Sequence, residues 1–292
     1  MEHIERIFVF GDSIQDNGNL CEKLNFPLSP FHDGRFCDGI LASEYLRNRL
    51  EEENSEQKLE LNNYAVGGAL SSGKNPKNLF TNSSISVDHQ IDQCLHKEKY
   101  LRDTDLVLLN GGANNFVFAI HDEVPYINVA AIYRVAKDLY MHANKVLSSG
   151  AGGVLLFNIP DITCAPFFEV LPLPNWFLNI YKKFVQYNIQ KQNKKISNYI
   201  MELQNKYQEA TIKEIDLYGL LNNVFLDPSP YGISNLMQPC VDSFGGVDAD
   251  CNIQYDLELV NDPKESLFFD YVHPTSVAQK ELSKLIYEKL YS

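Results

Sequence analysis

A serine near the start of the sequence and a histidine near its end could act together as a nucleophile and its base. An apolar run over residues 7–10 stops at Gly11-Asp12-Ser13, which predicts a strand that opens into a tight turn. A hydroxyl is a poor nucleophile until a base takes its proton, and imidazole is the side chain best suited to that role near neutral pH. His273 is the expected base, and attack by Ser13 on an ester carbonyl is the expected chemistry.

An aspartate stands three residues before His273, ahead of a proline that should start the last helix. Asp270 could hold one imidazole nitrogen while the other faces the nucleophile. Taken singly, Ser13 would be explained by a turn, and Asp270 by a helix cap with His273 merely exposed. Together with two glycine-rich loops that follow neighbouring predicted strands, the three residues favour a catalytic triad.

The rest of the sequence offers no competing chemistry. It contains no H-E-x-x-H, G-x-x-x-x-G-K-[ST] or G-x-S-x-G pattern, and no paired cysteines at the spacing of a zinc site. We therefore expect a reaction without metal or cofactor. None of the other histidines has a setting that suits a base: His3, His32, His89, His96, His121 and His142.

Strands and helices are expected to alternate along the chain. Apolar runs typical of strands lie at 7–10, 59–66, 106–109, 154–159 and 210–215. Helical periodicity covers 40–51, 127–147, much of 177–206, and 277–291. Near-continuous apolar strands are typical of a parallel sheet covered on both faces. No linker, low-complexity run or repeat divides the chain, so we expect one α/β domain over 1–292: a three-layer α/β/α sandwich around a mostly parallel five-stranded sheet.

The loops that follow the strands should meet at one edge of this sheet. Gly67-Gly68 follows the second expected strand, and Gly112-Ala113-Asn114-Asn115 follows the third. Glycines let the backbone approach a ligand closely, and a backbone N–H beside an asparagine amide could receive a developing negative charge on oxygen. These loops are the expected companions of the triad.

Composition limits the kinds of partner that the protein is expected to bind. The net charge of −13 and a pI near 5.0 argue against nucleic acid and weaken adsorption to anionic membranes, but they leave zwitterionic or micellar lipid accessible. No apolar run approaches the roughly 20 residues of a membrane-spanning helix, and no signal peptide is recognisable. The sequence is compatible with a cytoplasmic protein or with an exported one whose signal has been removed.

Two of the six cysteines bracket a polar, glycine-rich segment. A Cys240–Cys251 disulfide would close this segment and contribute roughly 2.5 to 3 kcal/mol in the chain-entropy model. It would also imply an oxidising compartment. Two free thiols are the alternative.

Four short motifs, in the correct order, resemble the GDSL or SGNH esterase and lipase family along the whole chain. They are Gly11-Asp12-Ser13 extended by Asp16-Asn17-Gly18-Asn19, Asn63-Tyr64-Ala65-Val66-Gly67-Gly68, Gly112-Ala113-Asn114-Asn115, and Asp270-x-x-His273. Ile14 replaces the usual leucine, and Asn115 replaces the common aspartate. The resemblance implies a flavodoxin-like hydrolase fold and a triad of Ser13, His273 and Asp270.

The same resemblance implies where the oxyanion is held. The backbone N–H groups of Ser13 and Gly68 and the side chain of Asn114 would form the oxyanion hole. The extended first motif and the cysteine-flanked loop look like the secreted bacterial branch of phospholipase A, lysophospholipase A and glycerophospholipid:cholesterol acyltransferase enzymes, most of all its PlaA-type lysophospholipases A.

This branch implies a lysophospholipid or other lipid ester as substrate, transient contact with a micelle or membrane surface, a secreted location and a monomer. The alternatives are a general short-chain or carbohydrate esterase, or an acyltransferase to sterol, on the same triad. Trp176 and Phe177 end an apolar segment at 166–177. We expect this segment to line an acyl groove, although packing in the core explains it equally well.

Overall fold

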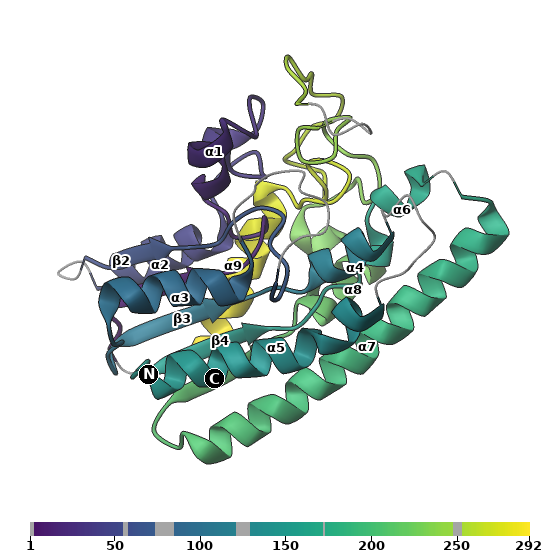
Figure 1. Cartoon of the computed structure of the whole chain (residues 1–292). Coiled ribbons are helices and arrows are strands. Elements are labelled where there is room, and N and C mark those ends of the chain that lie inside the picture. The colour runs from purple at the N-terminus through teal and green to yellow at the C-terminus, as the bar shows by residue number, and fades with distance from the viewer. Residues whose placement is uncertain (1–2, 55–57, 74–84, 121–128, 172, 248–252) are drawn as a thin grey trace.

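The computed structural model describes residues 3–54, 58–73, 85–120, 129–171, 173–247 and 253–292 (Figure 1). Its centre is a five-stranded sheet in the order β2-β1-β3-β4-β5, with every neighbouring pair parallel. The strands are β1 (Arg6–Phe10), β2 (Glu60–Asn63), β3 (Asp105–Leu109), β4 (Gly153–Phe157) and β5 (Thr211–Ile215). The predicted α/β class and parallel five-stranded sheet are confirmed.

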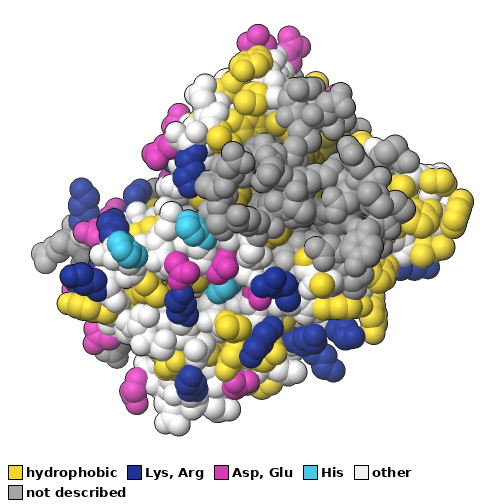
Figure 2. Space-filling view, viewed as in Figure 1, with side chains coloured by type: hydrophobic (Ala, Val, Ile, Leu, Met, Phe, Trp, Pro, Cys, Tyr) yellow, Lys and Arg dark blue, Asp and Glu magenta, His cyan; other side chains and the backbone are white. Residues whose placement is uncertain are grey.

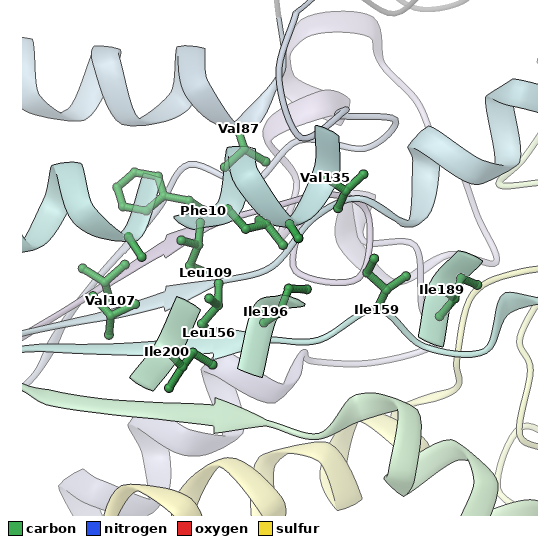
Figure 3. Close-up of a cluster of buried hydrophobic side chains, with 14 of the residues drawn as sticks. Phe10, Val87, Val107, Leu109, Val135, Leu156, Ile159, Ile189, Ile196 and Ile200 are labelled. Carbon is green, nitrogen blue, oxygen red and sulfur yellow. The ribbon is translucent and has the colours of Figure 1, made fainter. Parts of the chain in front are cut away.

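Alternation along the strands explains the three layers. Phe8, Phe10, Val107 and Leu109 point to one face of the sheet, where α3 (Val87–Glu98), α5 (Val129–Ser148) and α7 (Asn175–Lys206) cover them. Figure 3 shows part of this core, with strand side chains packed against α7. The intervening strand residues face α2 (Ala42–Glu53) and α9 (Ser276–Leu290) on the other side. Both faces are therefore apolar, as a buried parallel sheet requires.

The predicted helices all form, with small shifts at their ends: 40–51 is α2, 127–147 is α5, 177–206 is α7 and 277–291 is α9. The remaining helices are short. They are α1 (Asn19–Leu24), α4 (Ala113–Ile120), α6 (Phe167–Val170), α8 (Leu217–Leu226) and the 3-10 turns η1 (His32–Gly34), η2 (Ile162–Cys164) and η3 (Ser229–Tyr231). Within the described ranges, none of the helices combines the length and apolarity needed to cross a bilayer.

Candidate active site

Ser13 lies in a tight turn directly after β1, and the turn is held by its neighbours. Gln90 of α3 accepts a hydrogen bond from the Gly11 N–H at 2.8 Å and donates one to the Gly11 carbonyl at 2.7 Å. A Cβ at position 11 would lie 1.7 Å from Oδ1 of Asn110, so a side chain there would displace the amide that donates to Asp12. The serine that follows is fixed at the edge of the sheet with 8% of its surface exposed.

The structure brings the two ends of the chain together at this serine. His273 Nε2 lies 2.7 Å from Ser13 Oγ, and His273 Nδ1 lies 2.7 Å from Asp270 Oδ2. With a proton on Nδ1 donated to the carboxylate, Nε2 is the acceptor for the serine hydroxyl. This is the geometry that lets an imidazole take the proton of a nucleophile.

Asp270 is fully buried, and four N–H groups converge on its carboxylate. Oδ1 accepts from the backbone of Val272 at 2.8 Å and of His273 at 2.7 Å. Oδ2 accepts from the backbone of Gly245 at 2.8 Å, in addition to the imidazole. The carboxylate therefore cannot rotate without losing hydrogen bonds, and the imidazole keeps one orientation.

Two groups also fix the imidazole ring from its sides. The Phe36 ring centroid lies 4.8 Å from that of His273. Gly245 has φ of 66°, and a Cβ there would lie 3.3 Å from His273 Cε1 and 3.2 Å from Phe36, so a side chain at this position would be strained and tightly packed. Sequence reasoning assigned no role to Gly245, because nothing in a single glycine of a polar loop indicates a contact 25 residues along the chain.

The three predicted oxyanion residues line the same cavity as His273. The Ser13 N–H has no hydrogen-bond acceptor among the described residues. Asn114 lies in the first turn of α4, where its Nδ2 donates to the Ala69 carbonyl at 3.0 Å and keeps a second N–H. Gly68 adopts φ of 77°, a conformation that favours glycine. The three residues therefore share one cavity, and the Asn114 amide has a second N–H for a ligand bound there.

Asn115, the departure from the family motif, has a structural reason. Its Oδ1 accepts from the Ser71 N–H at 2.9 Å, and its Nδ2 donates to Ser71 Oγ at 3.1 Å and to the Ala131 carbonyl at 2.9 Å. A carboxylate has no proton to donate to that carbonyl. Asn115 thus ties the first turn of α4, which carries Asn114, to the loop after Gly68 and to α5.

Asp16 connects the turn of the nucleophile with the glycine loop. It accepts from the N–H groups of Gly18 at 3.0 Å, Asn19 at 2.7 Å, Leu20 at 3.2 Å and Gly67 at 2.7 Å. Burial raises the pKa of Asp16 to about 6, against the opposite influence of these hydrogen bonds. In the sequence Asp16 stands out only as part of a motif, because its bond to Gly67 joins residues 51 positions apart.

Asp12, the residue directly before the nucleophile, is also a buried carboxyl group. Its Oδ1 accepts from Asn110 Nδ2 at 2.9 Å and from the Ile14 N–H at 3.2 Å, while Oδ2 has no partner among the described residues. Burial raises the pKa of Asp12, which favours its neutral form. A neutral Asp12 would leave Asp270 as the charge that stabilises a protonated imidazole.

The cavity that opens at Ser13 has mostly apolar walls. Its walls come from the loops of the triad, from Phe167 and Phe168 of α6, and from α8 and α9; the apolar residues contributed by the last two helices are Leu217, Leu220, Leu221, Val224, Ala278 and Leu282. Trp176 and Phe177 are not among the lining residues, and Trp176 is 68% exposed at the start of α7. The predicted apolar segment therefore contributes its two earlier phenylalanines to the cavity, and its end points to solvent.

The cysteines and metal ligands give no further chemistry in the described part of the chain. Cys240 is buried, with its Sγ 3.4 Å from the Phe268 carbonyl, and Cys251, its predicted partner, lies outside the described residues. The disulfide and the oxidising compartment thus stay predictions. Among the described residues there is no cluster of side chains that could hold a metal ion.

Fold and site together define a serine hydrolase of the esterase and lipase class. The chain belongs to the GDSL-like lipase/acylhydrolase family, whose model matches residues 7–286. It is similar to a GDSL esterase/lipase of Arabidopsis thaliana, with 22% identity over 312 residues that cover 97% of this chain and 93% of the relative. The family predicted from the motifs is confirmed.

Two further similarities are informative. The phosphatidylcholine-sterol acyltransferase of Aeromonas hydrophila is 33% identical over 165 residues, which cover 54% of this chain and 45% of that protein. The structure of an acetylxylan esterase from Geobacillus stearothermophilus aligns with a TM-score of 0.54 and 13% identity, covering 99% of this chain and 95% of that one. At this identity the structural match shows the fold alone.

Proposed function

We propose that the protein hydrolyses the ester bonds of lipids through an acyl-enzyme, and that lysophospholipids, from which it releases a fatty acid, are its principal substrates. The observation that carries the proposal is the apolar cavity that opens directly onto Ser13. A single acyl chain could enter this cavity with its ester carbonyl at the serine hydroxyl. Burial of an acyl chain is favourable by about 0.8 kcal/mol for each CH₂ group removed from water.

The proposed reaction has two halves. In the first, Ser13 Oγ attacks the ester carbonyl and its proton passes to His273 Nε2, while Asp270 stabilises the imidazolium. The N–H groups of Ser13 and Gly68 and the Asn114 amide receive the oxyanion. The proton then passes to the departing alcohol, which leaves the acyl group on Ser13. In the second half, His273 takes a proton from water as the water oxygen attacks the acyl carbon. The bond to Ser13 Oγ then breaks, His273 returns the proton to that oxygen, and the fatty acid is released.

The experiment that tests this substrate class compares fatty-acid release from lysophosphatidylcholine, diacyl phosphatidylcholine and a short-chain nitrophenyl ester. We expect the highest kcat/KM with the single-chain lipid. Turnover confined to the short ester would contradict the lipid proposal and would favour a general short-chain or carbohydrate esterase.

Acyl transfer to a sterol is the second candidate, and the 33% identical acyltransferase supports it. A hydroxyl acceptor would then take the place of water in the second half-reaction. Adding cholesterol to the lysophosphatidylcholine assay separates the two candidates, because an acyltransferase forms cholesteryl ester at the expense of free fatty acid.

Replacement of Asn114 tests the oxyanion hole. We expect Asn114→Ala to lower kcat by about 10² to 10³ with little change in KM, because the amide contacts charge that develops only in the transition state. Steady-state kinetics on the nitrophenyl ester measure the effect, and circular dichroism checks the fold. An unchanged kcat would rule out this role.

Filling the cavity tests the position of the acyl chain. Val224 on α8 lines the cavity and is 4% exposed, whereas Leu226 on the same helix is 83% exposed and lies outside it. We expect Val224→Phe to lower kcat/KM for a long-chain ester by at least about tenfold relative to a butyrate ester, since even one methylene group in an apolar pocket alters discrimination by about 1 to 3 kcal/mol. Leu226→Phe is the matched control. Equal loss for both chain lengths in a folded Val224→Phe protein would place the acyl chain elsewhere.

A further inference from the structure

The outward face of α7 carries aromatic and aliphatic side chains together with lysines. Trp176, Ile180 and Tyr187 are 68%, 59% and 63% exposed. Lys183, Lys191 and Lys194 are exposed as well. Steps of three and four residues separate these positions, so all six side chains project from one face of the helix. We call these six residues the α7 face.

The fold does not need the α7 face for its own packing. The opposite side of the helix supplies the buried residues, among them Leu178, Val185, Ile189 and Ile196, which join the core under the sheet. Figure 2 shows apolar side chains at the right-hand end of the molecule, where Figure 1 places the start of α7, with basic side chains nearby. Large apolar side chains left in water next to cations are typical of a surface that meets a partner.

Charge identifies the kind of partner. The helix contains six lysines and one acidic residue, Glu202, which leaves +5 on an element of a chain whose net charge is −13. The net charge predicted weak adsorption to anionic membranes, but six of the chain's nineteen lysines lie on this one helix. A helix with aromatic and aliphatic residues among lysines is suited to an anionic lipid surface, where rings lie at the headgroup level and ammonium groups meet phosphates.

The position of the α7 face relative to the cavity supports the same partner. The first turns of α7 pack on α6: Tyr181 stacks on Phe168 with ring centroids 6.4 Å apart, and Lys182 forms an ion pair with Glu169. Phe168 also lines the cavity that opens at Ser13. A lipid surface bound to the α7 face would therefore lie next to a wall of the cavity.

We propose that the α7 face docks the protein on an anionic lipid surface and presents the cavity to lipids in that surface. This inference rests on the proposed function: docking on a lipid surface helps catalysis only if the substrate is a lipid in that surface. Trp176 contacts the headgroup region in this arrangement, in place of the acyl groove predicted from the sequence.

The only tryptophan of the chain lies on the proposed surface, so its fluorescence reports docking directly. The test uses Ser13→Ala protein, to prevent hydrolysis, and two kinds of vesicle: phosphatidylcholine alone, and phosphatidylcholine with phosphatidylglycerol in equal parts. We expect a blue shift of the emission with the mixed vesicles at low salt, quenching by brominated acyl chains, and reversal at high salt. The absence of a shift with mixed vesicles would overturn the proposal.

Charge reversal shows whether the α7 face causes the attachment. We expect Lys183→Glu/Lys191→Glu/Lys194→Glu to weaken binding to mixed vesicles by at least about tenfold, since each lysine near an anionic surface contributes to attraction. Lys97→Glu/Lys99→Glu/Lys280→Glu makes the same change of charge at exposed lysines elsewhere and should bind as the parent does. Equal loss in both triple variants would show that total charge, not the α7 face, governs binding.

Turnover separates this proposal from the proposed function. In the protein with Ser13 intact, the Lys183→Glu/Lys191→Glu/Lys194→Glu change should leave hydrolysis of a soluble nitrophenyl ester unchanged and reduce fatty-acid release from mixed vesicles. If the triple variant loses fatty-acid release from vesicles but keeps hydrolysis of the soluble ester, the docking proposal is supported. If the parent binds vesicles but releases no fatty acid from any lipid, the proposed function fails and the docking surface stands.

Discussion

Ser13→Ala should lower kcat by roughly 10⁶-fold, the loss typical of serine hydrolases without their nucleophile. The Ser13 hydroxyl lies 2.7 Å from His273 Nε2, and an alanine methyl group has neither a proton to transfer nor a lone pair to attack with. The fold should persist, because the turn is held by Gly11 and Gln90.

A fluorophosphonate probe gives an independent measurement of the same prediction. It should label the parent protein and Ser148→Ala, which removes an exposed hydroxyl at the end of α5, but not Ser13→Ala. Labelling of Ser13→Ala at the parent rate would show that another residue is the nucleophile.

Asp270→Asn should lower kcat by about 10⁴-fold, because an amide cannot hold the imidazole in the required tautomer. If the Asn amide nitrogen takes the place of Oδ2, it faces the N–H groups of His273 and Gly245; if it takes the place of Oδ1, it faces the backbone N–H groups of Val272 and His273. Either orientation leaves buried donors without an acceptor, which costs about 1 to 3 kcal/mol for each group.

Kinetics and thermal unfolding together separate the loss of catalysis in Asp270→Asn from its loss of stability. The loss of kcat should exceed anything explained by partial unfolding at the assay temperature. Asp242→Asn is the matched control, since Asp242 is exposed and, among the described residues, its side chain accepts only from the Tyr271 hydroxyl, which an asparagine oxygen can still do. A folded Asp270→Asn protein with kcat within tenfold of the parent would contradict the assigned role.

The pattern of apolar residues predicted the strands and long helices of this fold, because that pattern indicates which side chains are buried. Strands such as β4 are buried on both faces, and a run of apolar residues marks them regardless of their neighbours. Strand β2 ends at Asn63, well before the predicted end at 66, although the N–H groups of Tyr64 and Val66 still bond to the Val9 and Gly11 carbonyls. The loop predicted around Asn114 is the first turn of α4, whose position Asn115 fixes by hydrogen bonds to Ser71 and Ala131.

The sequence predicted the reacting residues of the candidate site but not the residues that hold them in place. Ser13, Asp270 and His273 stand in motifs whose spacing has a chemical meaning. The supporting contacts, made by Gly245, by Phe36 and by Gly67 with Asp16, join segments that are far apart in the sequence. Local sequence patterns do not predict which of these segments meet. Composition likewise could not decide whether Trp176 faces the cavity or solvent, because the answer depends on the rotation of α7 about its axis.

The 260-residue separation between Ser13 and His273 has a consequence for biosynthesis. Synthesis makes β1 before the other four strands of the sheet, and the imidazole and its carboxylate follow only after all five have been made. A growing polypeptide on the ribosome thus carries the nucleophile without its base while the next 260 residues are added. By our proposal, lipid hydrolysis begins only once the segment with Asp270 and His273 has folded back onto β1, so the producing cell's own lipids are not exposed to a partly synthesised enzyme.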